Sequence, residues 1–518
     1  MAKRSSQTSD KSAGAHERPS ARLSDAVPRQ GHVLSAVAER LGAPVRRAVA
    51  ELQSGLVDSQ CLAEGGKQSL NQRSGCVERS SSELAAWGLV AKWLVGVASG
   101  TLSGTATLAE AEAWFNGSPG KAGVAPQFDE RILTAAQKML PHDADRRSLA
   151  ELMPYILDPH GQASRLTVRS RPETVGPRAT KRAQGVFYTP EDVADFMVGR
   201  AVASTDDSIS QVTVLDPACG TGVFLRAALK ALKSRRVDIS PIDLVCGSLF
   251  GTDIDSWVVD AAAYVLLLDV LERRQTKKNA PGELWKRIRQ NFACIDALLI
   301  DPAAHVKGRR KTRPGSNRVP VDRVFPRLRK GPTLVVGNPP YAELGQRADM
   351  LELTANFLTL PETPRGKVDF YPLFIEQMVR LANPAGGGAL VVPLSVAVNS
   401  GRQFVATRRF IGKTPGEWRF AFFDREPHAL FGEDVKTRNA IICWSRGTEQ
   451  TSRLSTGPLR KWRGANRAEM FEKIRYTPLV ADISNHEGLR GLPEARPGRG
   501  RVVVPGYPHQ RHNVFPRS

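Results

Sequence analysis

Four consecutive residues, Asn338-Pro339-Pro340-Tyr341, have the chemistry to act on a planar amino group. Asn338 offers a side-chain oxygen and Pro339 a backbone carbonyl, and neither proline has an N–H that would compete for these acceptors. Two such acceptors suit an NH2 group, and the Tyr341 ring offers a face on which a flat heterocycle can stack. Taken alone, the tetrapeptide is explained equally well as a strand followed by a turn that the prolines stiffen.

The residues before this tetrapeptide predict where it lies. The apolar run 334–336 reads as a short buried strand, and the two prolines then prevent further ladder pairing. The chain must therefore turn at the carboxyl end of a strand. Ligands bind at that edge in open α/β sheets, so Asn338 and Tyr341 are expected at a ligand site.

A second strand end carries Asp216 and a glycine turn. The β-branched run 212–215 leads into Asp216, and Gly220 and Gly222 precede residues 224–233, which predict a helix. Glycines let the backbone approach a ligand closely, the helix N-terminus favours negative charge, and Asp216 could hold a cationic amine. A dinucleotide-binding loop would have a third glycine where this chain has Leu225, so that alternative is disfavoured.

Together, Asp216-Pro-Ala-Cys-Gly-Thr-Gly222 and Asn338-Pro-Pro-Tyr341 resemble the S-adenosylmethionine-dependent DNA N6-adenine methyltransferases of restriction–modification systems. The order of the motifs is that of the gamma-type enzymes, and the resemblance covers residues 184–444. It implies a Rossmann-like class I methyltransferase sheet of the α/β class, S-adenosyl-L-methionine as cofactor and double-stranded DNA as partner. It also implies that Asn338, Pro339, Pro340 and Tyr341 are the catalytic residues.

The resemblance also implies a set of cofactor-binding residues. Asp253 follows a predicted strand, 244–250, and is implied to accept hydrogen bonds from the ribose; Asp255 is the alternative, although it could merely cap the next helix, 261–271. Asp296, after a third strand, is implied to accept from the adenine amine, unless it is a surface residue in a turn. The complete set is Tyr188, Thr189, Pro190, Asp216, Ala218, Gly220, Gly222, Asp253, Asp296 and Ala297.

The start of a helix is predicted within this set. Thr189 is expected to cap it, with Pro190 at its first position and acidic residues in its first turn. In the family, this segment closes over the methionine end of the cofactor.

Later segments complete the expected sheet. Residues 367–378 predict an amphipathic helix, 386–393 a turn and strand, and 422–444 the closing hairpin. The resemblance implies that Phe423 packs on a flipped base. Phe370 and Tyr371 are explained equally well as a wall for the cofactor's adenine or as core.

The chain of 518 residues has a net charge of +21, which favours a polyanionic partner over a neutral one. A basic insert, 305–330, has no hydrophobic period and is expected to be a loop that contacts DNA phosphates. The residues implied in this contact are Lys307, Arg309, Arg310, Lys311 and Arg313. The six cysteines show no metal-ligand or disulfide spacing, and neither a secretory signal nor a membrane span is indicated. We therefore expect no metal site and a cytoplasmic location.

The expected organisation has four parts. Residues 1–30 predict a disordered basic tail, 31–165 a helical N-terminal domain without nuclease motifs, and 180–446 the catalytic domain. Residues 447–518 are a short extension, interpreted as a remnant of a target-recognition domain. This departs from the family, so either a separate specificity or nuclease subunit acts with the chain, or the chain is truncated. An RNA or protein-glutamine methyltransferase, or a DNA-binding subunit without activity, are the alternative functions.

Overall fold

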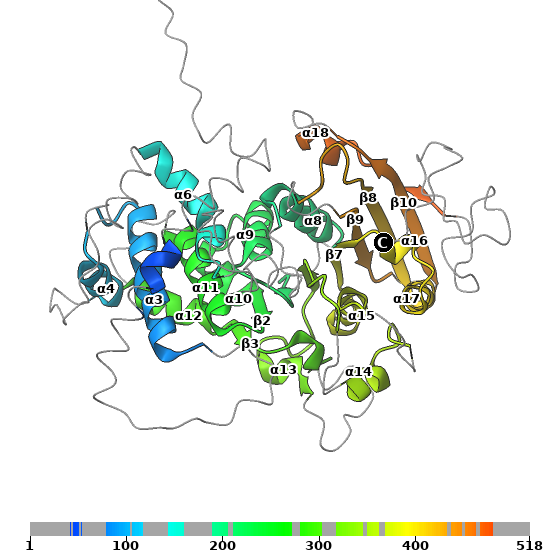
Figure 1. Cartoon of the computed structure of the whole chain (residues 1–518), viewed down its shortest axis with the longest axis horizontal. Helices are drawn as coiled ribbons and strands as arrows, with labels where there is room; N and C mark the ends of the chain where they lie inside the picture. The colour runs from blue at the N-terminus through cyan, green and yellow to red at the C-terminus, as the bar shows by residue number, and fades with distance from the viewer. Residues whose placement is uncertain are drawn as a thin grey trace, which may run out of the picture.

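The computed structural model (Figure 1) describes the helical part before the sheet, the sheet and its covering helices. The described residues are 42, 45–50, 53, 79–103, 106–117, 143–159, 189–205, 211–271, 280–302, 318–344, 350–361, 368–431, 437–447, 451–462 and 467–479.

A nine-stranded sheet forms the centre, in the order β11-β10-β8-β9-β7-β6-β1-β2-β3. Strands β3, β2, β1, β6 and β7 are parallel, and β9 runs antiparallel between β7 and β8. This confirms the α/β class, the strand at 334–336 and the closing hairpin. The strands are β1 (Val214–Asp216), β2 (Leu249–Asp253), β3 (Phe292–Cys294), β6 (Leu334–Gly337), β7 (Gly387–Pro393), β8 (Gly416–Phe423), β9 (Asn439–Ser445), β10 (Ser452–Arg460) and β11 (Thr477–Pro478); β4 (Ile300–Asp301) and β5 (Val319–Pro320) form a separate pair.

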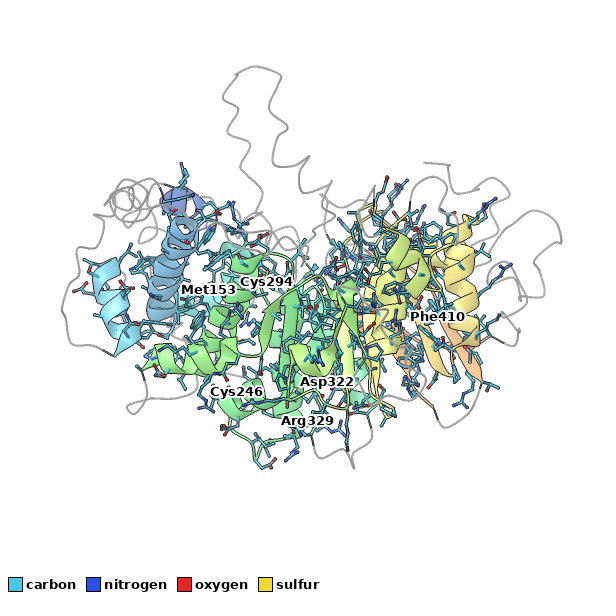
Figure 2. All side chains as sticks on the ribbon, turned by 90° about the horizontal axis from the view of Figure 1, so that it is seen from below. Met153, Cys246, Cys294, Asp322, Arg329 and Phe410 are labelled. Carbon is cyan, nitrogen blue, oxygen red and sulfur yellow. The ribbon has the colours of Figure 1, made fainter. Side chains whose placement is uncertain are left out.

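Two hydrophobic cores cover the two faces of the sheet, because successive strand residues point to opposite sides. Val214 and Val336 belong to one core, and their neighbours Leu215 and Val335 belong to the other. The first core contains α3 (Ser81–Ala98), α4 (Leu108–Asn116), α6 (Asp143–Ile156), α8 (Glu191–Ala203), α9 (Val223–Arg235), α10 (Pro241–Ser248), α11 (Ser256–Leu271), α12 (Pro281–Arg289) and α18 (Arg467–Glu472). The second contains α13 (Val321–Val324), α14 (Met350–Asn356), α15 (Tyr371–Leu381), α16 (Ser395–Val398) and α17 (Arg402–Lys413). Met153 and Phe410, from these two sets, lie toward opposite ends of the molecule in Figure 2.

The N-terminal helices pack directly on α11. Trp87 of α3 stacks on Trp257 at 5.1 Å between ring centroids, and the Trp257 indole donates to the Leu157 carbonyl at 2.9 Å. Because α3 and α6 cover the side of α11 that faces away from the sheet, this helix is buried on all sides, as predicted for 261–271. Helices α3, α4 and α6 confirm the helical character predicted for the N-terminal region, of which large parts lie outside the described residues.

Two secondary-structure predictions are wrong. Residues 244–248 belong to helix α10, which starts because the Ser240 hydroxyl accepts from Asp243 N–H and Pro241 takes the first position; the strand begins only at Leu249. The end of the basic insert is not a loop either, since β5 and α13 form there. Arg318, 6% exposed, starts this segment and pairs with Asp301 at 2.7 Å.

The sheet continues beyond the boundary expected at residue 446. Strand β10 pairs in parallel with β8, and β11 adds the edge. Arg467 at the start of α18 donates to both carboxylate oxygens of Asp192, at 2.5 and 3.0 Å, in the first turn of α8. Residues 452–462 and 467–479 are therefore part of the same fold as the central sheet. The predicted tail 1–30 and residues 480–518 lie outside the described parts. No described helix is long and apolar enough to cross a membrane.

Candidate active site

Four predicted site residues lie at the carboxyl ends of four neighbouring strands. Strands β3, β2, β1 and β6 are adjacent and parallel, so their carboxyl ends lie along one edge of the sheet. Asp253 and Asp216 are the last residues of β2 and β1, Asn338 directly follows β6, and Asp296 comes two residues after β3. The fold brings the two sequence motifs to the same edge of the sheet, as was predicted from the strand that precedes each motif.

The two motifs touch at Gly337 and Asp216. A Cβ atom at Gly337 would lie 2.6 Å from Asp216 Oδ1, so only glycine permits this close approach. Asp216 is fully buried; its Oδ1 accepts from the Ala218 N–H at 3.1 Å, and its Oδ2 has no partner among the described residues. Burial, with a smaller contribution from Asp253, raises the pKa of Asp216 well above its ordinary value. A buried carboxylate of this kind is stabilised by a cationic ligand.

Asp253 supports the glycine turn. The Gly220 N–H donates to Asp253 Oδ2 at 3.0 Å, and the Asp255 N–H donates to Oδ1 at 3.1 Å. Burial raises the pKa of Asp253 to about 6. Gly220 has a φ of +51°, and a Cβ atom built there would meet nothing within 4 Å, so open space adjoins this carboxylate. Gly222 is the N-cap of α9.

Asp255, the alternative to Asp253, has another role. Arg79 donates to both of its carboxylate oxygens at 2.8 and 2.6 Å, and Asp255 Oδ1 accepts from the Trp257 N–H at the start of α11. With 2% exposure, Asp255 is a buried cap and an ion-pair partner of the N-terminal region. The predicted helix cap is confirmed, and the ion pair with Arg79 is an additional role that the sequence did not indicate.

Asp296 is buried and holds a tight turn. Its Oδ1 accepts from the Leu298 N–H at 2.9 Å, which caps a single turn of 3-10 helix, Ala297–Leu299. The Ala297 carbonyl accepts from Gln377 of α15 at 2.7 Å. The alternative of a surface aspartate is wrong, since Asp296 is 6% exposed. Its contact with adenine stays a prediction.

Asn338 is held by the segment that precedes α8. Its Nδ2 donates to the Thr189 hydroxyl at 3.1 Å, and the Thr189 carbonyl accepts from the Tyr155 hydroxyl at 3.2 Å. Thr189 therefore does not cap α8 as predicted. The N-cap is Pro190, and no side chain bonds there because the Thr189 hydroxyl faces Asn338 instead. Tyr188 lies outside the described residues.

The Tyr341 hydroxyl is fixed at two points. It donates to the Val391 carbonyl of β7 at 3.1 Å and accepts from Asn439 Nδ2 of β9 at 3.3 Å. The ring meets Tyr371 and Phe431 edge to face, each at 6.2 Å. Burial raises the pKa of Tyr341 well above its ordinary value, so the phenol stays neutral.

Phe423, predicted to pack on a flipped base, is fully buried in the first core. Its ring centroid lies 6.3 Å from Trp462 and 5.9 Å from Phe471, so no surface is left for a base, and this structure contradicts the predicted role. Phe431 and Asn439 are the site neighbours that the sequence did not single out. The predicted phosphate-binding residues Lys307, Arg309, Arg310, Lys311 and Arg313 lie outside the described residues.

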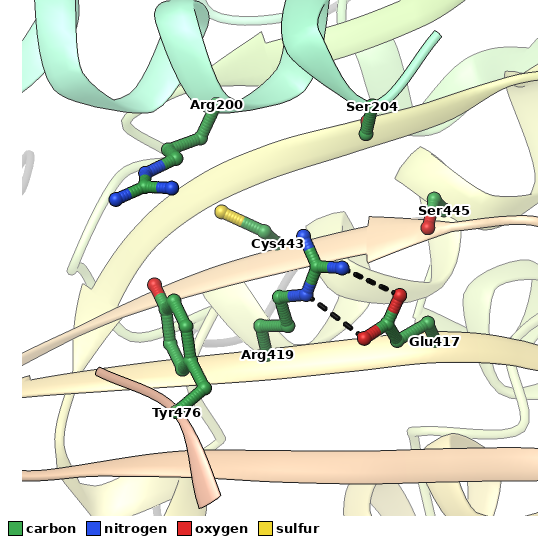
Figure 3. A pocket seen from close by; sticks show the side chains of 7 residues that line it. All are labelled: Arg200, Ser204, Glu417, Arg419, Cys443, Ser445 and Tyr476. Atoms are coloured by element: carbon green, nitrogen blue, oxygen red, sulfur yellow. Dashed lines mark hydrogen bonds and ion pairs between the residues drawn. The ribbon is translucent and has the colours of Figure 1, made fainter. Parts of the chain in front are cut away.

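A small polar pocket (Figure 3) lies by β8 and β9, away from the carboxyl ends of the strands that carry the predicted site residues. Arg200, Cys443 and Tyr476 line it, and Arg419 beside them pairs with Glu417 at 2.9 and 2.7 Å. Glu417 lies near the start of β8 and Cys443 near the end of the antiparallel β9, so the pocket is at the amino end of the parallel strands. It has room for about one water molecule. It is separate from the predicted site.

Two protein families match the region that contains Asp216, Asp253, Asp296 and Asn338. Residues 177–288 match the N-6 DNA Methylase family, and residues 247–416 match the Eco57I restriction-modification methylase family. A type II methyltransferase of Thermus thermophilus, M.TthHB8I, is 25% identical over 231 residues, which are 43% of this chain and 37% of that enzyme. These matches support the predicted resemblance to the adenine methyltransferases of restriction–modification systems.

Solved structures share the fold. A DrdV–DNA complex superposes with a TM-score of 0.56 at 15% identity, covering 88% of this chain and 46% of that one. A nuclease-deletion mutant of the Type ISP restriction-modification enzyme LlaGI, in complex with a DNA substrate mimic, superposes with a TM-score of 0.50 at 14% identity. The match covers 87% of this chain and 38% of that one. The chain thus spans less than half of each of these relatives. The Rossmann-like methyltransferase fold is confirmed, and the family matches support S-adenosyl-L-methionine as cofactor.

Proposed function

We propose that this chain transfers a methyl group from S-adenosylmethionine to N6 of an adenine in double-stranded DNA, in a restriction–modification system. The observation that carries the proposal is the contact between the two halves of the site, where Gly337 of the Asn-Pro-Pro-Tyr strand packs on Asp216 of the glycine-turn strand. A methyl donor and an acceptor amine bound on either side of this contact would lie next to each other, as direct transfer requires.

The residues present fit the cofactor. Asp216 Oδ2 is buried without a partner among the described residues, and the ammonium group of the cofactor's methionine moiety would compensate its charge. The open space at Gly220 leaves room for the ribose beside Asp253. Asp296 and Ala297, just after the neighbouring strand β3, would contact the adenine. When bound, the cofactor supplies a methyl group on a sulfonium leaving group.

The residues on the other side of the contact would activate the target amine. The exocyclic nitrogen of adenine is a poor nucleophile, because its lone pair is delocalised into the ring. Asn338 Oδ1 and the Pro339 carbonyl would accept hydrogen bonds from its two N–H groups and favour a tetrahedral nitrogen as the methyl arrives. The methylated nitrogen, which is cationic at first, then loses one of these protons to solvent. The bond from Asn338 Nδ2 to Thr189 fixes which end of the amide is turned to the substrate.

The target base must leave the duplex before Asn338 can reach it. Flipping costs a few kcal/mol, and stacking on the Tyr341 ring offsets part of this cost. The net charge of +21 favours binding of the DNA backbone, and we include Lys307, Arg309, Arg310, Lys311 and Arg313 among the phosphate contacts on the basis of their charge. The chain is proposed to carry out methyl transfer by itself, and a separate specificity or nuclease subunit is proposed only as a further partner in the complete system.

The test is methyl transfer by the purified chain from labelled S-adenosylmethionine to plasmid DNA, bulk tRNA and protein. We expect label in plasmid DNA, recovered as N6-methyladenine, and none with Asn338→Ala. Label in tRNA or protein alone would overturn the proposal. In the host, one genomic sequence motif should lose N6-methyladenine when the gene is deleted and regain it with the wild-type gene.

A further inference from the structure

Asn439 is a polar residue in an apolar position. It begins β9, where its backbone pairs with Pro393 of β7 on one side and Phe423 of β8 on the other. Its side chain is fully buried. A buried amide costs free energy unless its polar atoms are hydrogen-bonded, so a purely structural requirement at this position would be met better by an apolar residue.

The contact that Asn439 makes is with the ring proposed to hold the base. Its Nδ2 donates to the Tyr341 hydroxyl at 3.3 Å, while its Oδ1 is buried with no partner among the described residues. The Tyr341 hydroxyl itself donates a hydrogen bond to the Val391 carbonyl on the neighbouring strand at 3.1 Å. Two adjacent strands therefore fix the oxygen end of the ring, and Tyr371 and Phe431 contact the ring edge to face.

We propose that Asn439 is a positioning residue for Tyr341, and that the two side chains form one buried polar pair. Its effect on methyl transfer rests on the function proposed above, whereas the pairing is a property of the fold. The pair sets the plane of the ring before a base arrives, so that stacking requires less ordering when the base binds.

The pair has a consequence for conservative substitutions. Tyr341→Phe keeps the ring face but removes the partner of a fully buried amide, which is penalised. Asn439→Leu replaces that amide by an apolar group of similar size. Removing both side-chain partners together is expected to cost less than Tyr341→Phe alone, because no buried amide is left without its acceptor; the Val391 carbonyl loses its donor in either case. The two substitutions should therefore compensate each other in part.

The experiment is a double-substitution cycle on the full chain, with Y341F, N439L and Y341F/N439L. The thermal unfolding midpoint, the affinity for S-adenosylmethionine and the single-turnover rate of methyl transfer to DNA are measured for each. We expect Y341F to slow methyl transfer by about tenfold and to lower the unfolding midpoint. The double variant should recover part of both losses, since the bond to the Val391 carbonyl stays absent, and cofactor affinity should be the same in all four proteins.

Tyr371→Phe is the matched control. Its hydroxyl is bonded to Ser395 at 2.7 Å, and its ring touches Tyr341, but it has no bond to Asn439 in the structure. N439L should not compensate Y371F.

The outcomes separate the pairing from the proposed function. Compensation in the unfolding midpoint without any DNA methylation by the wild type would support the pair and overturn the function. Methylation by the wild type with strictly additive losses in the cycle would overturn the pair and leave the function standing. Compensation of stability but not of rate would overturn the positioning role.

Discussion

The two halves of the site are built in different ways. On the cofactor side, Asp216 and Asp296 each accept from a backbone N–H two residues further along the chain. On the target side, Asn338 is bonded to a side chain 149 residues away, and Tyr341 to one 98 residues away. Local backbone turns hold Asp216 and Asp296 on the cofactor side, where Asp253 is also bonded to Gly220, 33 residues away, whereas side chains of distant elements orient both residues of the target side.

This difference predicts that the two halves can be damaged independently. Substitutions on the cofactor side should change cofactor affinity, and substitutions on the target side should change the rate or the handling of the base. A substitution that changed both would show that the contact between Gly337 and Asp216 couples the halves.

Asn338→Ala should have the largest effect. It removes an acceptor whose value is greatest when the target nitrogen becomes tetrahedral, and loss of a comparable preorganised group costs roughly 100- to 1000-fold in rate. Single-turnover methylation measures the loss, and calorimetric titration should give unchanged cofactor affinity. Near-normal turnover would mean that Asn-Pro-Pro-Tyr is only a stiff turn and that Asn338 has no catalytic role.

Asp253→Ala should weaken cofactor binding by about 1.5–3 kcal/mol, the usual contribution of hydrogen bonds to a charged group. At saturating cofactor the methylation rate should be close to that of the wild type, because the target side is intact. Asp243→Ala, at an exposed helix position, is the matched control. Unchanged affinity in calorimetry would remove the ribose role from Asp253.

Tyr341→Ala should lose a stacking platform of about 1–3 kcal/mol. A fluorescent adenine analogue at the target position would report a smaller extrahelical population, while cofactor affinity stays constant. If the analogue signal is unchanged, the ring does not hold the base, and the target side of the comparison fails.

The sequence predicted the strand ends and the glycine turn of the cofactor side for a physical reason. A strand end, a glycine turn and a helix start are local features, so Asp216, Gly220 and Asp253 could be placed from their neighbours in the chain. Local pattern gave the wrong prediction at residues 244–248, because an apolar run is compatible with a buried strand and with a buried helix. Here the N-cap at Ser240 favours the helix.

The target side was predicted only in part. Asn338 and Tyr341 were found from their own motif, but the partners that orient them are long-range. Nothing near Thr189 indicates that its hydroxyl bonds Asn338 rather than capping α8. The role of Phe423 was implied by the resemblance of the closing hairpin, yet the alternation of the strand turns its side chain into the first core, beside Phe471.

The smallest expected effect is a pH dependence of the cofactor side. Burial raises the pKa of Asp253 from its ordinary value of 3.8 to about 6. The ionised carboxylate is the better acceptor for ribose hydroxyls, so affinity should rise as pH increases through about 6 and level off above about 7. Folding responds in the opposite direction: the native state binds this proton more tightly than the unfolded chain, so its stabilising contribution is lost as pH rises through 6.

Calorimetric titration between pH 5 and pH 8 measures this dependence, and below the pKa affinity should fall by at most about tenfold per pH unit. Asp253→Asn cannot ionise and should flatten the part of the profile that Asp253 contributes. Asp216 also has a raised pKa, so Asp216→Asn is needed to separate its titration from that of Asp253. Tyr341→Ala should leave the profile unaltered, because the ring belongs to the other half of the site. A profile that is flat in the wild type would mean that Asp253 is not the group the ribose requires, whereas a profile altered by Tyr341→Ala would mean that the two halves are coupled.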